Sequence, residues 1–227
     1  MADLQTFLLI APVLLLSMVA HEYAHGYAAL RQGDSTAADL GRLTWNPIKH
    51  IDPFMTILLP VMTFFAGGFI FGGAKPVPVQ PANFREYVRG DIIVSLAGVA
   101  SNAVLVVVCA ILFAAVGALA PAMPAAYGAA RIAQQVLSYG ILFNFILIFF
   151  NLLPIPPLDG SHVVKHLLPP AWQRSYVKIG AFGLIVLVGL LTIGRPILDL
   201  WMAPMWALQG AIVRLLAPWA IPAGAIG

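Results

Sequence analysis

Long apolar runs separated by short polar loops dominate the chain. The first run extends from Leu4 to Leu30, the third from Ile92 to about Leu119, and the fourth from Ile132 to Leu153. Each is longer than the roughly 20 residues that an α-helix needs to cross a bilayer. Two weaker segments follow, Ile179 to Gly194 and Leu200 to Val213. The pattern predicts an all-α polytopic membrane protein with four to six membrane segments.

A second apolar run, Pro53 to Phe71, is interrupted by Pro60 and by the pair Gly67-Gly68. If it crossed the membrane, the 12 Lys and Arg residues would divide five against seven between the two faces, whereas a run that enters and returns divides them ten against two. Because membrane proteins concentrate loop cations on the cytoplasmic side, this segment is predicted to be re-entrant. The ten are Arg31, Arg42, Lys49, Lys75, Arg85, Arg89, Lys165, Arg174, Lys178 and Arg214; the other two are Arg131 and Arg195.

Composition supports the membrane assignment. Of the 227 residues, 61% are hydrophobic and 9% are charged, against about a quarter charged in soluble domains. The net charge of +3 is carried by scattered loop cations, which fits anionic lipid headgroups and excludes a nucleic-acid partner. Little length remains outside the apolar runs. We therefore expect residues 1–227 to form one membrane-embedded domain, with any regulatory module supplied by a separate protein.

Candidate chemistry begins inside the first apolar run, with His21, Glu22 and His25 in the pattern His-Glu-x-x-His. On a helix, positions four apart differ by about 400° of rotation, so both imidazoles face one ion. This pattern binds Zn²⁺, with the glutamate as general base for water. A buried polar cluster without metal is the alternative. A carboxylate at the bilayer centre costs about 2.5 to 3.5 kcal/mol and marks a functional site, which favours the metal.

Two proline-rich stretches, GGAKPVPVQP and LPIPPLD, are predicted to be short extended segments near this site, because proline removes backbone donors and restricts φ. The second stretch contains Asp159, a candidate for the third zinc ligand. The alternative is that Asp159 caps the helix SHVVKHLL that follows. Residue spacing alone leaves both roles open.

His162 and His166 are also four residues apart. On a helix they could form a second metal site or replace Asp159 as a ligand. We favour a simpler interpretation, in which they are interfacial histidines beside Lys165 and the lipid headgroups.

Five motifs in order, HEYAHG, GRLTWNPIKHIDP, GGAKPVPV, SLAGVASN and NLLPIPPLDG, resemble the site-2 protease family of intramembrane zinc metalloproteases, in its compact form without a PDZ or CBS domain. The resemblance implies that His21, His25 and Asp159 bind one catalytic Zn²⁺ and that Glu22 is the base. It also implies a substrate that is itself a membrane protein with a transmembrane helix. The family proline is replaced by Val99 in the third motif.

Asn102 occupies the asparagine position of that third motif. Its amide could bind the substrate carbonyl or stabilise the oxyanion. A hydrogen bond between helices, which buried asparagines often make in membranes, is the alternative, and the sequence does not separate the two.

Two other classes of protein also bury histidines and carboxylates in a membrane: zinc or proton transporters, and inactive relatives that serve as scaffolds. A transporter is expected to place charged ligands on several helices, whereas Glu22 is the one formal charge inside the first four predicted segments. The intact His-Glu-x-x-His motif and Asp159 argue against a scaffold. The cation distribution further predicts an active site that faces the cytosol. The compact size and the lack of a targeting sequence fit a prokaryotic inner membrane.

Overall fold

The structure, a computed structural model, describes residues 4–67 and 72–222. Its α-helices are α1 (Leu4–Gln32), α2 (Thr36–Asp39), α3 (Leu59–Gly67), α4 (Tyr87–Leu119), α5 (Tyr127–Asn151), α6 (Asp159–Leu167), α7 (Pro170–Lys178), α8 (Gly183–Thr192) and α9 (Arg195–Leu216). Within these described ranges no β-strand is present. The all-α prediction is confirmed.

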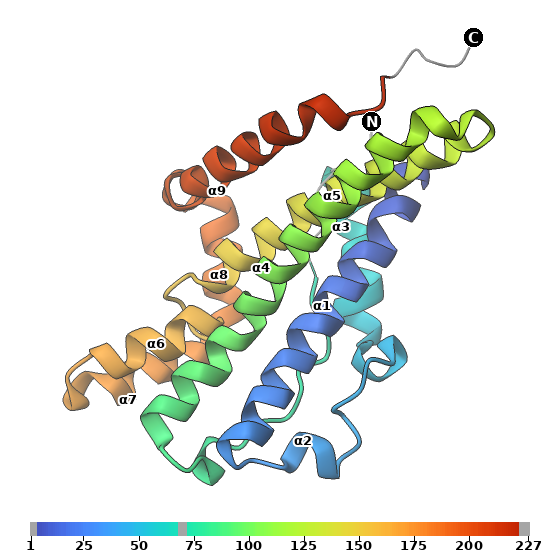
Figure 1. Cartoon of the computed structure of the whole chain (residues 1–227). Coiled ribbons are helices and arrows are strands. Elements are labelled where there is room, and N and C mark those ends of the chain that lie inside the picture. The colour runs from blue at the N-terminus through green and yellow to red at the C-terminus, as the bar shows by residue number, and fades with distance from the viewer. Residues whose placement is uncertain (1–3, 68–71, 223–227) are drawn as a thin grey trace.

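Three long helices, α1, α4 and α5, pack side by side as the central bundle (Figure 1). With α9, they are the four described helices that are long and apolar enough to cross a membrane; the bent pair α7 and α8 would be a fifth span if it crosses as one. The helices extend further than the apolar runs, because backbone hydrogen bonds continue into polar residues. As α4 begins at Tyr87, it includes Asp91. Asp91 precedes the predicted segment by one residue, so Glu22 remains the one formal charge inside the first four predicted segments.

The predicted re-entrant segment begins and ends at the same height along the helix bundle. It starts with a helical turn at Pro53–Leu58 and continues as α3. Beyond residues 68–71, which lie outside the described residues, the Gly73 amide donates to the Met55 carbonyl at 3.0 Å. The Phe64 ring on α3 lies 5.3 Å from the ring of Phe7 on α1. The segment therefore runs along α1 toward its N-terminus and comes back, which agrees with the prediction.

The returning chain, residues 72–80, has neither helix nor strand geometry and passes along α1. Side-chain acceptors and donors hold it there: Asp34 accepts from the Gln80 amide at 2.7 Å, and Arg42 donates to the Lys75 carbonyl at 3.0 Å. The side chain of Val77 is buried against Gly26, where a Cβ would lie 2.9 Å from it. Glycine at this position on α1 lets the returning chain approach the helix closely.

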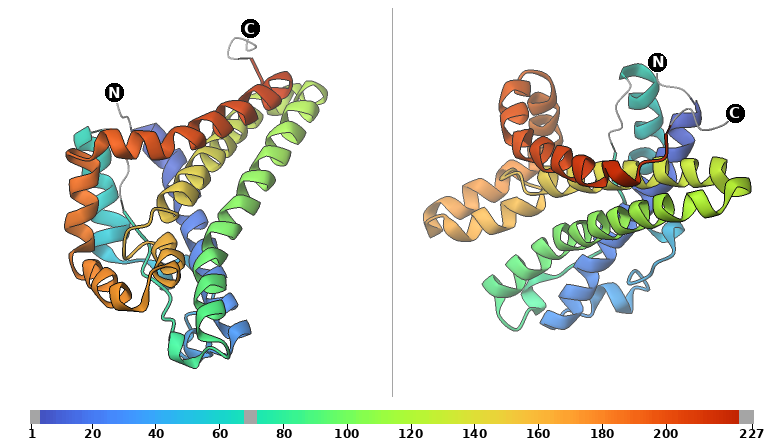
Figure 2. Two further views of the ribbon diagram at one scale, coloured as in Figure 1. Left: turned by 90° about the vertical axis from the view of Figure 1, so that its left-hand side faces the viewer. Right: turned by 45° about the horizontal axis from the view of Figure 1, so that its top comes forward.

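The last helix is longer than predicted and runs antiparallel to α5. Near its start, the Trp201 indole donates to the Phe149 carbonyl at 2.8 Å; just after its end, the Trp219 carbonyl accepts from the Gln134 side chain at 2.8 Å. Buried contacts between α9 and the bundle involve Val106, Ile141, Phe145, Met205 and Leu216. Figure 2 shows α9 crossing the bundle toward the turn between α4 and α5.

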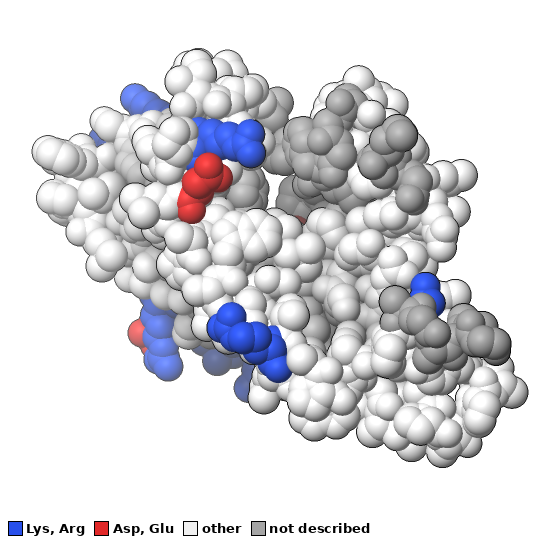
Figure 3. Space-filling model, turned by 90° about the horizontal axis from the view of Figure 1, so that it is seen from above, with Lys and Arg blue, Asp and Glu red and all other residues white. Residues whose placement is uncertain are grey.

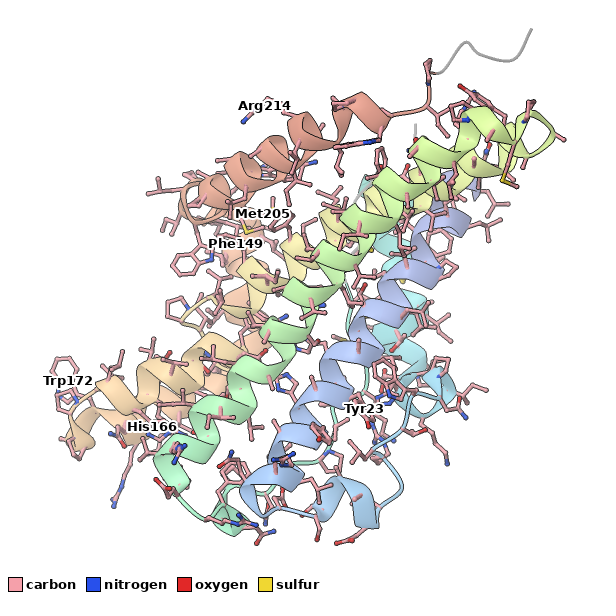
Figure 4. All side chains as sticks on the ribbon, in the orientation of Figure 1. Tyr23, Phe149, His166, Trp172, Met205 and Arg214 are labelled. Carbon is pink, nitrogen blue, oxygen red and sulfur yellow. The ribbon has the colours of Figure 1, made fainter. Side chains whose placement is uncertain are left out.

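This course corrects the predicted placement of Arg214. Because α8 has ten residues, about 15 Å of helix, it is too short to cross by itself, and α9 carries the chain to the end of the bundle where α5 begins (Figure 4). Arg214 therefore lies with Arg131, apart from the other nine residues of the predicted cationic face. Seen from above, most of the surface is uncharged and charged side chains are few (Figure 3).

Candidate metal centre

The unbroken helix α1 presents His21 and His25 on one face, as their spacing predicts. Their Nε2 atoms lie 2.9 Å apart, and their rings meet edge to face. The opposing surface of α4 is Gly98, where a Cβ would lie 2.5 Å from each imidazole. Glycine at position 98 therefore provides the space in which the two rings converge.

Each imidazole is held through its other nitrogen by α4. His25 donates from Nδ1 to the Val94 carbonyl at 2.7 Å, and His21 donates from Nδ1 to the Asn102 side-chain oxygen at 2.6 Å. A carbonyl oxygen can only accept, so Nδ1 carries the proton in both rings. Both Nε2 atoms therefore present lone pairs to the same space, the arrangement found in metal-ligating histidines.

Asp159 completes a group of three potential metal ligands. Its Oδ2 lies 3.2 Å from Nε2 of His21 and 3.4 Å from Nε2 of His25, and this buried oxygen has no hydrogen-bond donor. Three acceptor atoms, all within 4.8 Å of one another, repel unless a cation lies between them. The donor set of two imidazoles and one carboxylate fits Zn²⁺ with a position left open.

The alternative role of Asp159 as a helix cap is not adopted. Asp159 is the first residue of α6, the cap position is Leu158, and no side chain caps this helix. The carboxylate points instead toward the two imidazoles on α1. The structure thus speaks against the cap role, and the ligand role of Asp159 stays a prediction.

Glu22 lies next to His21 on α1 and is half-buried. Its Oε2 accepts the Val77 backbone N–H at 2.7 Å. This contact ties the carboxylate to the returning chain, residues 72–80.

A buried polar chain that the sequence analysis missed supports His21 from behind. The Asn102 side-chain N–H donates to Asn144 Oδ1 at 2.7 Å, and the Asn144 side-chain N–H donates to Ser17 Oγ at 2.9 Å and to the Gly140 carbonyl at 2.8 Å. All three side chains are buried. The sequence feature that could have predicted this chain is the presence of a polar residue inside two of the apolar runs, Ser17 in the first and Asn144 in the fourth.

His162 and His166 do not form a metal group of their own. Both contact the buried carboxylate of Asp91 on α4, and Lys165 contacts it as well; Figure 4 shows His166 pointing from α6 toward the first turns of α4. In the ranges that the structure describes, His21, His25 and Asp159 form the one group of three potential ligands. The expectation of interfacial histidines among the lipid headgroups is wrong for His166, whose side chain is buried against Asp91; His162 is more exposed but also pairs with Asp91.

A membrane helix bundle with two histidines and an aspartate around one ion position, next to a glutamate, defines a membrane-embedded zinc metalloprotease. Known proteins agree. The model of peptidase family M50 matches residues 121–193. YwhC of Bacillus subtilis, named as a candidate zinc metalloprotease, is 40% identical over 173 residues, which cover 76% of this chain and 75% of YwhC.

Rip2 of Mycolicibacterium smegmatis, also named as a candidate zinc metalloprotease, is 34% identical over 204 residues, which cover 86% of this chain and 70% of Rip2. Its counterpart in Mycobacterium tuberculosis is 30% identical over 199 residues. No solved structure matches the chain. This chain belongs to peptidase family M50, the site-2 protease family of membrane zinc metalloproteases.

Proposed function

We propose that this protein hydrolyses peptide bonds within or near transmembrane segments of other membrane proteins, with His21, His25 and Asp159 as zinc ligands and Glu22 as general base. The observation that carries the proposal is the convergence of three acceptor atoms within 4.8 Å of one another, two from α1, the helix that bears Glu22, and one from α6, the Asp159 oxygen that has no hydrogen-bond donor. Membership of the M50 family supports it.

The residues around the site have separable roles in this proposal. When bound, Zn²⁺ supplies a Lewis acid that polarises the scissile carbonyl and makes water nucleophilic at neutral pH. Glu22 takes a proton from that water at a carboxylate oxygen and returns it to the leaving amine. The Val77 N–H holds Oε2 of Glu22 at 2.7 Å, which fixes the direction of the carboxylate.

The depth of the site indicates the class of substrate. His21 lies 11 residues before the end of α1 at Gln32, about 16 Å along the helix axis. Peptide bonds that reach this depth belong to other membrane segments, and a helical substrate must unwind locally because its helix encloses the peptide bonds. We further propose an inner-membrane location with the site facing the cytosol, and selection of substrates by a separate regulatory protein.

Removal of zinc tests the proposed function. The purified protein, incubated in detergent with a panel of single-span substrates, is expected to cleave at least one of them within or near its span. Treatment with a zinc chelator should abolish cleavage, and stoichiometric Zn²⁺ should restore it, as measured by gel analysis and mass spectrometry of the products. Cleavage that persists in a sample shown by elemental analysis to be free of zinc would contradict the proposal.

Adding a transport measurement separates the other two classes of protein. Zinc movement across the membrane of sealed proteoliposomes, without cleavage, would identify a transporter. Bound zinc with neither cleavage nor transport would identify a scaffold.

For Asn102, the contacts support a positioning role toward His21. Its oxygen accepts from His21 and its amide nitrogen donates to Asn144, so both ends are occupied and the side chain is fully buried. Because Asn144 takes the amide nitrogen, the oxygen of Asn102 is the end that faces the imidazole. This orientation keeps the proton of His21 on Nδ1 and its lone pair on Nε2.

Two substitutions distinguish positioning from oxyanion stabilisation. Asn102→Leu removes the acceptor and is expected to weaken zinc binding about 10- to 100-fold, the usual cost of losing the partner of a ligating histidine. Asn102→Asp keeps an acceptor and should retain zinc better than the leucine variant. Zinc affinity is measured by chelator competition. If Asn102→Leu leaves affinity unchanged and kcat falls about 10²- to 10³-fold, Asn102 acts on the oxyanion instead.

A further inference from the structure

A second buried ionic cluster joins α6 to α4. Asp91 on α4 is 3% exposed and meets three basic side chains of α6. His162 Nδ1 lies 3.0 Å from Oδ1 of Asp91, His166 Nε2 lies 2.7 Å from Oδ2, and Lys165 donates to Oδ2. Every member of this cluster lies outside the set of zinc ligands and the general base.

The cluster fastens the helix that carries Asp159. With nine residues, α6 is too short to be stable by itself, and no side chain caps its start. Asp159, His162 and His166 follow one another at intervals of three and four residues, so they share one face of α6. One end of this face reaches the zinc ligands of α1, and the other end reaches Asp91.

The residues of α4 that contact the proposed ligands, or the helix that carries one of them, lie on a single face of α4. Positions 91, 94, 98 and 102 are spaced by three, four and four residues. Val94 accepts from His25, Gly98 admits both imidazoles, and Asn102 accepts from His21. Asp91 is the remaining position on this face, and its partners lie on α6.

The contacting residues are equally spaced on the two helices. Asp91 and Gly98 are seven residues apart on α4, and Asp159 and His166 are seven residues apart on α6, about 10 Å in each case. Asp159 meets the two imidazoles that pack on Gly98, and His166 meets Asp91, so the two intervals run in opposite directions. A shift of α6 along α4 would therefore break the ionic cluster and displace the carboxylate of Asp159 together.

We propose that Asp91 is a positioning residue that sets the place of Asp159 in the zinc site by fixing α6 on α4, an inference that rests on the proposed ligand set. His162, Lys165 and His166 all bind one buried carboxylate, that of Asp91. Removing this carboxylate therefore removes all three of these contacts between α6 and α4. Burial lowers the pKa of Lys165, but its ion pair with Asp91 raises that pKa above the ordinary lysine value, so the ammonium group stays charged. Among the residues that the structure describes, Asp91 is the anionic partner of this charge, and its loss would leave the ammonium group without one.

The test compares Asp91→Asn with a matched control, Glu86→Gln. Glu86 lies directly before α4 and forms an exposed ion pair with Arg89 at 3.2 Å, so the control also removes one carboxylate beside the same helix start. Zinc affinity is measured by chelator competition, and the ligand geometry by the visible absorption spectrum of the Co²⁺-substituted protein. Asp91→Asn is expected to weaken zinc binding about 10- to 100-fold and to change the cobalt spectrum, whereas Glu86→Gln should match the wild type in both.

Lys165→Met provides a second variant that breaks the cluster from α6 and leaves Asp91 paired with two histidines. If Asp91→Asn does not fold, the folded Lys165→Met protein is expected to show a smaller loss of affinity and the same change in spectrum. Wild-type affinity and an unchanged cobalt spectrum in the folded variant overturn the inference. Wild-type protein that binds metal but cleaves no substrate contradicts the proposed function alone, since both readouts here depend on the metal and not on cleavage.

Discussion

Replacing Glu22 with glutamine is expected to lower the rate of peptide cleavage about 10²- to 10⁴-fold while the protein retains one bound zinc. Glutamine has the shape of glutamate, and its oxygen can still accept the Val77 N–H that holds Oε2 in the wild type. It cannot take a proton from water. The zinc ligands on α1 and α6 are untouched, so the metal stays.

The measurement pairs zinc content by elemental analysis with cleavage of the best single-span substrate. Glu86→Gln is the control, because it removes an exposed carboxylate that lies outside the site. Cleavage by Glu22→Gln at the wild-type rate would eliminate Glu22 as the base. Loss of zinc from this variant would show instead that Glu22 is needed for metal binding.

Replacing Asp159 with alanine is expected to reduce the bound zinc from one per chain to almost none. The substitution removes the one anionic ligand, whose Oδ2 lies 3.2 and 3.4 Å from the two imidazole nitrogens, and leaves two neutral histidines. Loss of a ligand should cost more than the roughly 10- to 100-fold loss of affinity that follows loss of a ligand's partner. Cleavage should disappear with the metal.

Two variants make this experiment specific. Asp199→Ala removes an exposed carboxylate on α9 and should bind one zinc per chain. His162→Ala removes one of the three partners of Asp91 and should also keep one zinc per chain at saturating metal. Zinc retained by Asp159→Ala and lost from His162→Ala would identify His162 as the third ligand.

The central apolar segments and their helical state were predictable because hydrophobic length follows directly from bilayer thickness. The ends of the helices were harder to predict. Hydropathy marks the apolar centre of a helix, whereas α4 continues five residues before Ile92 through Arg89 and Asp91. The weak last segment was predicted at 200–213 and extends over Arg195–Leu216, because a helix tolerates the charged residues at its ends once it packs on α5.

The sequence by itself determined the pair of histidines and the adjacent glutamate. His21, Glu22 and His25 lie within five consecutive residues of one helix, where local geometry brings them together. The proposed third ligand needed both family resemblance and the fold, since spacing allowed Asp159 to be a cap. Tertiary structure alone decided the partners of the site. Asn102 and Asn144 are 42 residues apart, Ser17 and Asn144 are 127 apart, and Asp91 and His166 are 75 apart. Contacts at such separations arise from how helices pack, and a pattern along the chain does not encode which polar residues will face one another.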